Sequence, residues 1–234
     1  MALVGAGEFL PSMGEIDAEL LASLGSVRPR VAIVPTASYP DGEDVFRRWA
    51  AMGVEHFGGL GAEVEAVFIR DRSSADDPTY AQAIGEADLI YFSGGKPRHL
   101  LEALAGSAAE AALLAAHARG AAVAGCSAGA MVLAGRQADM RRNVLPWPLR
   151  WLSGLGIVPG VAVFPHYDGM PEALAAAMAL QAPRGIAIVG IDEETAVVGR
   201  DGSWQVRGRG RVTLWHGRRR DRYRAGERVP LAPD

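Results

Sequence analysis

A serine flanked by glycines stands near the middle of the chain, between an apolar run and a helical run. The apolar run covers residues 120–124, a Gly-x-Ser-x-Gly motif centred on Ser127 follows, and residues 130–134 have helical character. Strand, tight turn and helix in this order is the setting in which the motif forms a nucleophile elbow. The serine then lies at a helix N-terminus, where backbone N–H groups favour a developing oxyanion. The pattern predicts Ser127 as the nucleophile of an acyl transfer, with an ordinary Gly-Ser turn as the competing interpretation.

A serine nucleophile needs a base within hydrogen-bond reach and a third group that orients the base. The chain has five histidines. His166 follows a predicted strand at residues 161–164, and open α/β sheets place their sites at the carboxyl ends of strands. We therefore predict His166 as the base. The other histidines lie in predicted helices, near a helix start or near the end of a hairpin: His56, His117, His99 and His216.

The third group is an acid, and the sequence offers several candidates for it. Three consecutive acids at residues 192–194 end a predicted strand that covers residues 185–191. Because alternate residues of an extended segment face opposite ways, Glu193 should point away from its two neighbours. This alternation favours Glu193 but leaves the choice open. The competing candidates are Asp139, Asp168 and Asp192.

A pair of glycines closes another predicted strand, residues 87–92, at the same edge of the sheet. Their N–H groups carry no side-chain bulk, so together with the N–H of Ala128 they could hold the oxyanion of a tetrahedral intermediate. We predict Gly95 and Ala128 as the oxyanion donors and Gly94 as a candidate substrate-binding residue. A plain turn between a strand and a helix is the competing interpretation.

The remaining segments predict the fold that must position these residues. Apolar strands alternate with helical segments, which is typical of βαβ units whose strands are covered on both faces. We predict an α/β three-layer sandwich with a mostly parallel sheet, helices on both faces, a nucleophile elbow and short C-terminal β hairpins. Residues 135–160 are expected to form a long loop over the strand ends. No linker or repeat divides the chain, so the predicted organisation is a single domain covering residues 1–234.

Composition argues against several classes of protein. The chain is 49% hydrophobic and 22% charged, as is typical of globular proteins. No apolar run approaches the ~20 residues of a membrane span, and a net charge of −3 offers no general attraction for nucleic acid. Cys126 is the only cysteine, so no internal disulfide can form and a reducing compartment is expected. We expect a cytoplasmic monomer or homodimer that needs no metal or cofactor and has no membrane or nucleic-acid partner.

Several motifs resemble those of the dipeptidase E and cyanophycinase family of serine peptidases, whose fold is similar to class I glutamine amidotransferases. They occur in the family's order from the Gly7-Glu8-Phe9 opening to about Ala196: FSGG at 92–95, GCSAGA at 125–130, PH at 165–166 and GIDEETA at 190–196. The resemblance implies Ser127 as nucleophile, His166 as base and Glu193 as acid. Cyanophycinases continue with an Arg-Gly-Arg-type segment after the histidine, which this chain lacks.

The implied activity is hydrolysis of small peptides through an acyl-enzyme, with N-terminal Asp-X bonds or isopeptide bonds as candidate targets. Asp139 resembles an aspartate near the dipeptidase E site. The candidate substrate-binding residues are Gly94, Arg98, Asp139 and Asp168, with Arg141 and Arg142 as further candidate arginines.

Three alternatives compete with a peptidase. An α/β-hydrolase esterase could use the same elbow, with Asp139 as an acid that precedes His166 in the chain. A glutamine amidotransferase would use Cys126, although a residue next to the apex should point into the fold. Nucleic-acid binding is suggested by nine arginines against two aspartates in residues 200–224, for which solvated hairpin arginines are the ordinary explanation.

Overall fold

The computed structural model describes residues 1–139, 148–200 and 202–231. Its strands are β1 (Ala2–Val4), β2 (Arg30–Val34), β3 (Glu63–Ala66), β4 (Leu89–Phe92), β5 (Ala122–Cys126), β6 (Ala134–Ala138), β7 (Trp151–Ser153), β8 (Val158–Phe164), β9 (Ala187–Ile191), β10 (Thr195–Arg200), β11 (Ser203–Gly208), β12 (Arg211–His216), β13 (Arg219–Arg224) and β14 (Arg228–Val229). Its α-helices are α1 (Gly14–Ala22), α2 (Glu43–Gly59), α3 (Pro78–Glu86), α4 (Pro97–Leu104), α5 (Ala108–Ala118), α6 (Ala128–Leu133) and α7 (Glu172–Ala179).

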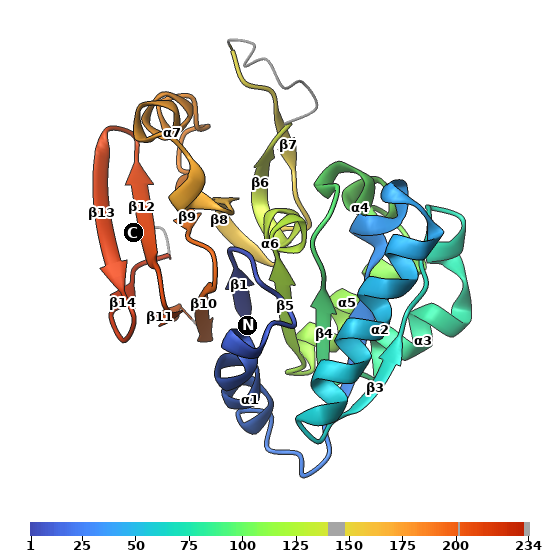
Figure 1. The fold of residues 1–234 in the computed structure, drawn as a ribbon. Coiled ribbons are helices and arrows are strands. Elements are labelled where there is room, and N and C mark those ends of the chain that lie inside the picture. Colours follow the sequence, from blue (N-terminus) through green and yellow to red (C-terminus); the bar gives the residue numbers. More distant parts are fainter. Residues whose placement is uncertain (140–147, 201, 232–234) are drawn as a thin grey trace.

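The parallel strands that the sequence predicts form one side of an eight-stranded sheet (Figure 1). Its order is β14-β11-β10-β1-β5-β4-β2-β3, and β1, β5, β4, β2 and β3 pair in parallel. In β2, Val31 and Ile33 pack with residues of α1 and α2, whereas Ala32 and Val34 pack with residues of α3, α4 and α5. Successive side chains thus enter cores on opposite faces, which is why these strands read as continuous apolar runs. The predicted α/β fold with helices on both faces is confirmed.

A second sheet of six strands was not expected from the sequence, and it corrects the prediction of a long loop at residues 135–160. Its order is β13-β12-β9-β8-β6-β7. Within the loop range lie most of β6, all of β7, and the start of β8 at Val158 rather than Val161. The sequence of β6, Ala-Gly-Arg-Gln-Ala, has little intrinsic preference for a strand. Its extended form follows from pairing with β8 on one side and β7 on the other.

The two sheets pack face to face at the C-terminal side of the molecule. Val197 of β10 and Val206 of β11 share one apolar cluster with Val212 and Leu214 of β12. The opposite face of the second sheet is covered by α7, whose Met178 belongs to a separate cluster with β8 and β9. The predicted C-terminal hairpins are present as β10–β11 and β12–β13. One hairpin belongs to each sheet.

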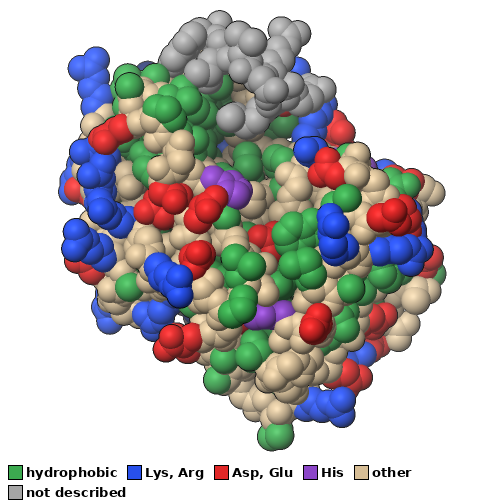
Figure 2. Space-filling view, in the orientation of Figure 1, with side chains coloured by type: hydrophobic (Ala, Val, Ile, Leu, Met, Phe, Trp, Pro, Cys, Tyr) green, Lys and Arg blue, Asp and Glu red, His purple; other side chains and the backbone are tan. Residues whose placement is uncertain are grey.

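The arginine-rich stretch at residues 200–224 is divided between these hairpins, and in the described part of the chain at least five of its nine arginines pair with acids. On the corresponding side of Figure 2, Lys and Arg side chains alternate with Asp and Glu. Such exposed pairs contribute little to stability, but they offset the charge of five of the nine arginines. The matched arginines are Arg207 with Glu19, Arg209 with Glu194, Arg219 with Asp221, and Arg220 and Arg222 with Glu172.

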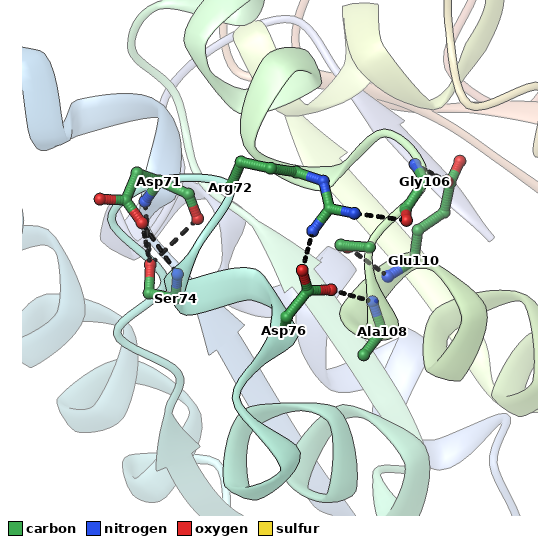
Figure 3. Close-up of polar contacts among 8 residues, drawn as sticks. Asp71, Arg72, Ser74, Asp76, Gly106, Ala108 and Glu110 are labelled. Atoms are coloured by element: carbon green, nitrogen blue, oxygen red, sulfur yellow. Dashed lines mark hydrogen bonds and ion pairs between the residues drawn. The ribbon is translucent and has the colours of Figure 1, made fainter.

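A polar network fixes the segment after β3 to the junction of α4 and α5 (Figure 3). Arg72 pairs with Asp76 and donates to the Gly106 carbonyl at 2.6 Å, while Asp76 accepts the N–H of Ala108 at 2.9 Å. The N–H of Ala108 holds the pKa of Asp76 below its ordinary value. The network anchors the far end of α4, the helix that begins just after Gly95.

No single helix among the described residues is long and apolar enough to span a membrane. Helices α4 and α5 together have the length and composition of a span, but the chain bends by 91° between them.

Candidate active site

Ser127 occupies a strained turn between β5 and α6. Its backbone angles are φ 50° and ψ −107°, outside the usual regions for a residue with a side chain. A Cβ atom at Gly125 would lie 2.5 Å from the carbonyl carbon of Gly129, and one at Gly129 would lie 2.4 Å from the Phe92 oxygen. Both glycines of the motif are therefore required by close backbone contacts. The Ser127 N–H donates to the Val4 oxygen at 2.9 Å, which fixes the apex to β1.

His166 and Glu193 lie within hydrogen-bond reach of the serine and of each other. The Oγ of Ser127 is 3.1 Å from Nε2 of His166, and Nδ1 of His166 is 2.8 Å from Oε1 of Glu193. His166 follows β8 and Glu193 follows β9, and these strands are parallel neighbours. Their carboxyl ends thus present base and acid together opposite the elbow. The side chains of His166 and Glu193 are 51% and 57% exposed, so this part of the site is open to water.

The other acids near this strand end have different partners. Asp168 accepts the backbone N–H of Glu193 at 3.0 Å, and Asp192 accepts that of Arg211 at 2.9 Å. Glu194 lies 3.1 Å from Arg209. Asp192 and Glu194 are half-buried rather than free at the surface, and burial raises the pKa of Asp192. Strand alternation does separate Glu193 from both neighbours, while Asp168 supports the backbone of the acid.

The glycine turn after β4 contributes one free N–H rather than two. The N–H of Gly94 donates to Oε1 of Glu8 at 2.6 Å and is not available to an oxyanion. Among the described residues, the N–H groups of Gly95 and Ala128 have no hydrogen-bond partner. Gly95 has φ 138°, and a Cβ there would lie 2.3 Å from the Ala37 oxygen, so only glycine fits. The arrangement leaves Gly95 and Ala128 as the candidate donors.

Cys126 is buried beneath the elbow and is not placed as a nucleophile. Its Sγ lies 2.8 Å from Oε2 of Glu8, to which the thiol donates. Burial, followed by the negative charge of Glu8, raises the pKa of Cys126 well above its ordinary value. A thiolate is the reactive form of cysteine, so this environment argues against the amidotransferase alternative.

The candidate substrate-binding residues Arg98 and Asp139 pair with each other. Nη1 of Arg98 lies 3.1 Å from Oδ2 of Asp139, and Nε donates to Glu102 at 2.6 Å. The Asp139 side chain is only 7% exposed. Arg98 is therefore already neutralised by two carboxylates. Arg141 and Arg142 lie outside the described residues, and no group of three or more metal-binding side chains occurs in the part of the chain that the structure describes.

Glu8 is a residue of this site to which the sequence motifs assign no role. Its side chain is buried, and both of its oxygens accept hydrogen bonds from residues beside the elbow. The available signal was a single acid within the otherwise apolar opening of the chain, residues 2–10. A lone buried acid is costly unless it is satisfied, so its position in such a run indicates a specific partner.

The chain is similar to known peptidases over most of its length. The family model of peptidase family S51 matches residues 1–207. The crystal structure of a peptidase from an acI-B1 Actinobacterium is 31% identical, with a TM-score of 0.86 over 98% of this chain and 95% of that chain. A putative peptidase E protein from Listeria monocytogenes EGD-e is 18% identical, with a TM-score of 0.61 over 89% of this chain and 98% of that chain, a likeness of fold. The chain belongs to peptidase family S51 and is a serine peptidase.

Proposed function

We propose that the protein hydrolyses small peptides through a triad of Ser127, His166 and Glu193. The observation that carries the proposal is the pair of hydrogen bonds that joins them, 3.1 Å from Ser127 to His166 and 2.8 Å from His166 to Glu193. Nucleophile, base and orienting acid in this order are the parts that acyl transfer to serine requires.

Each residue has a defined part in the reaction. The Ser127 oxygen attacks the carbonyl carbon of the scissile bond while Nε2 of His166 takes the hydroxyl proton. The N–H groups of Gly95 and Ala128 stabilise the resulting oxyanion. When the C–N bond breaks, His166 returns that proton to the leaving amine and an acyl-enzyme remains. Water then attacks the ester, again with His166 as base, and releases the acid product and the free serine. Glu193 orients the imidazole and stabilises its protonated form.

The chain order of the triad separates this proposal from the esterase alternative. In α/β-hydrolases the acid precedes the histidine, whereas here the acid bonded to His166 follows it by 27 residues. Asp139, the acid that would have satisfied the esterase order, pairs with Arg98. The matched charges of the C-terminal hairpins likewise weaken the nucleic-acid alternative.

The substrate class that we propose is a short peptide of the dipeptidase E kind, with an N-terminal Asp-X or isopeptide bond as candidate targets. An acidic substrate side chain would have to displace Asp139 or Glu102 to reach Arg98. Preference for aspartate thus needs a direct test. Wild type and Ser127→Ala should be screened against dipeptides and short peptides with free N-termini. The same peptides blocked at the N-terminus and peptides with isopeptide bonds should be screened beside them. Hydrolysis of short peptides by wild type alone is expected; hydrolysis of esters only would contradict the proposal.

Replacing Glu193 by glutamine should lower kcat by about 10²–10⁴, the upper value being typical of a buried triad acid. A smaller loss is expected here because Glu193 is 57% exposed, so water already screens its charge. Glu194→Gln is the matched control, since this neighbour pairs with Arg209 instead. It should change kcat only a few-fold. Equal losses in the two variants would mean that Glu193 is not the third member.

A further inference from the structure

Glu8 is a buried carboxylate whose position the reaction steps above do not explain. It follows β1, and its side chain is 6% exposed. A carboxylate removed from water costs several kcal/mol unless hydrogen bonds satisfy it. Here both oxygens are satisfied, Oε1 by the N–H of Gly94 at 2.6 Å and Oε2 by the thiol of Cys126 at 2.8 Å.

These partners belong to three adjacent strand ends. Glu8 follows β1, Cys126 ends β5 and Gly94 follows β4, and the order in the sheet is β1-β5-β4. One side chain thus joins the strand that carries the nucleophile to the turn that carries a candidate oxyanion donor. A single hydrogen bond thus connects Glu8 and Gly94, which lie 86 positions apart in the chain.

The glycine turn is held on both sides of the free N–H. Glu8 accepts the N–H of Gly94, and the Ala37 oxygen accepts that of Lys96 at 2.6 Å. Gly95 lies between these two anchored residues. The space is tight, because a Cβ atom at Gly94 would lie 2.7 Å from Oε1 of Glu8 and 3.4 Å from Cβ of Ser127. The turn therefore lies between the Glu8 carboxylate and the nucleophile.

We propose that Glu8 is a positioning residue of the oxyanion hole. By holding the N–H of Gly94 away from the reacting atoms, it directs the N–H of Gly95 toward the oxyanion that forms at Ser127. The inference rests on the proposed function, since it assumes an acyl transfer at Ser127. Glu8 acts through Gly94 and Gly95 and touches no substrate atom.

The test compares Glu8→Ala, Glu8→Gln and Gly94→Ala. The active sites of each variant are counted by titration to completion with a fluorophosphonate, and kcat is expressed per titrated site. Glu8→Ala should lower kcat by about 10²–10³, the range for loss of one oxyanion donor, and leave KM nearly unchanged. Glu8→Gln keeps an oxygen acceptor of the same shape for Gly94, so it should recover most of the lost kcat. Gly94→Ala puts a Cβ atom 2.7 Å from Oε1 of Glu8, so the carboxylate and the turn must move apart. It therefore weakens their hydrogen bond without removing the carboxylate and should resemble Glu8→Ala.

Asp17→Ala is the matched control. Asp17 is another buried carboxylate, 1% exposed, and it bonds to Nε2 of His56 at 2.8 Å instead of to the turn. Its loss should lower Tm and leave kcat per titrated site unchanged. Glu8→Ala that behaves in the same way would overturn the proposal, because a purely structural role would reduce the number of active sites and not their rate.

Two further outcomes would also overturn it. Glu8→Gln as slow as Glu8→Ala would mean that the charge matters and not the hydrogen bond to Gly94. Full kcat in Gly94→Ala would mean that the position of the turn does not limit the reaction. This variant tests the proposal even if Glu8→Ala does not fold. If Ser127→Ala still hydrolyses peptides, the proposed function itself is wrong, whatever the results for the Glu8 variants.

Discussion

Replacing Ser127 by alanine should abolish peptide hydrolysis, with a fall in kcat on the order of 10⁶, as for a serine nucleophile in other triads. The reason is the loss of the oxygen that forms the acyl-enzyme, since Ser127 stands at the apex of the elbow, 3.1 Å from His166. A fluorophosphonate should label wild type at Ser127. Intact-mass measurement should find one adduct on wild type and none on Ser127→Ala.

The matched control for this labelling is Cys126→Ala. The thiol is buried, and its pKa is raised, so it should not compete for the reagent. Cys126→Ala should keep the adduct. An adduct that disappears with Cys126 and persists in Ser127→Ala would turn the assignment toward a thiol-dependent enzyme.

Replacing His166 by alanine should cost kcat almost as much as the loss of the serine, again about 10⁶ in comparable triads. Without a base the Ser127 hydroxyl keeps its proton and attacks poorly. Because the two residues act as one unit, the double variant should be no slower than either single variant. Steady-state kinetics of the two single variants and the double variant would measure this.

His216→Ala is the control for this variant, because His216 is also exposed but ends β12. It should leave kcat unchanged. His99→Ala is a poorer control, since the His99 Nε2 bonds to the Arg70 oxygen at 2.7 Å and contributes to the fold. A large loss in His216→Ala, with His166→Ala unaffected, would show that the base has been misassigned.

The elbow could be predicted from the sequence because its constraints are local. Gly125 and Gly129 lie within two residues of Ser127, and the close contacts that demand them arise from the turn itself and from the adjacent strand. His166 and Glu193 could be proposed because parallel strands end at one edge of a sheet, so position along a strand determines position in space. These inferences needed no knowledge of side-chain packing.

The second sheet and Glu8 could not be predicted in the same way. β6 has the composition of a loop, and it becomes a strand only because β8 and β7 lie beside it. The role of Glu8 depends on contacts with Gly94 and Cys126, 86 and 118 positions away. Likewise, nothing in the pair Gly94-Gly95 distinguishes the N–H that is bonded from the one that is free. Each of these features is decided by tertiary contacts.

The outermost described strand of the second sheet, β13, has a consequence for how copies of this chain behave at high concentration. The edge strand of a sheet offers unpaired backbone groups to which another chain can add, which is a common route to aggregation. Four of the six residues of β13 are arginine, and all four are exposed. Asp221 and Glu172 pair with three of these arginines, and the positive charge that remains in excess repels a second such edge at short range before backbone pairing can begin. The arginine-rich hairpin thus provides colloidal protection to a sheet whose inner strands carry the base and the acid.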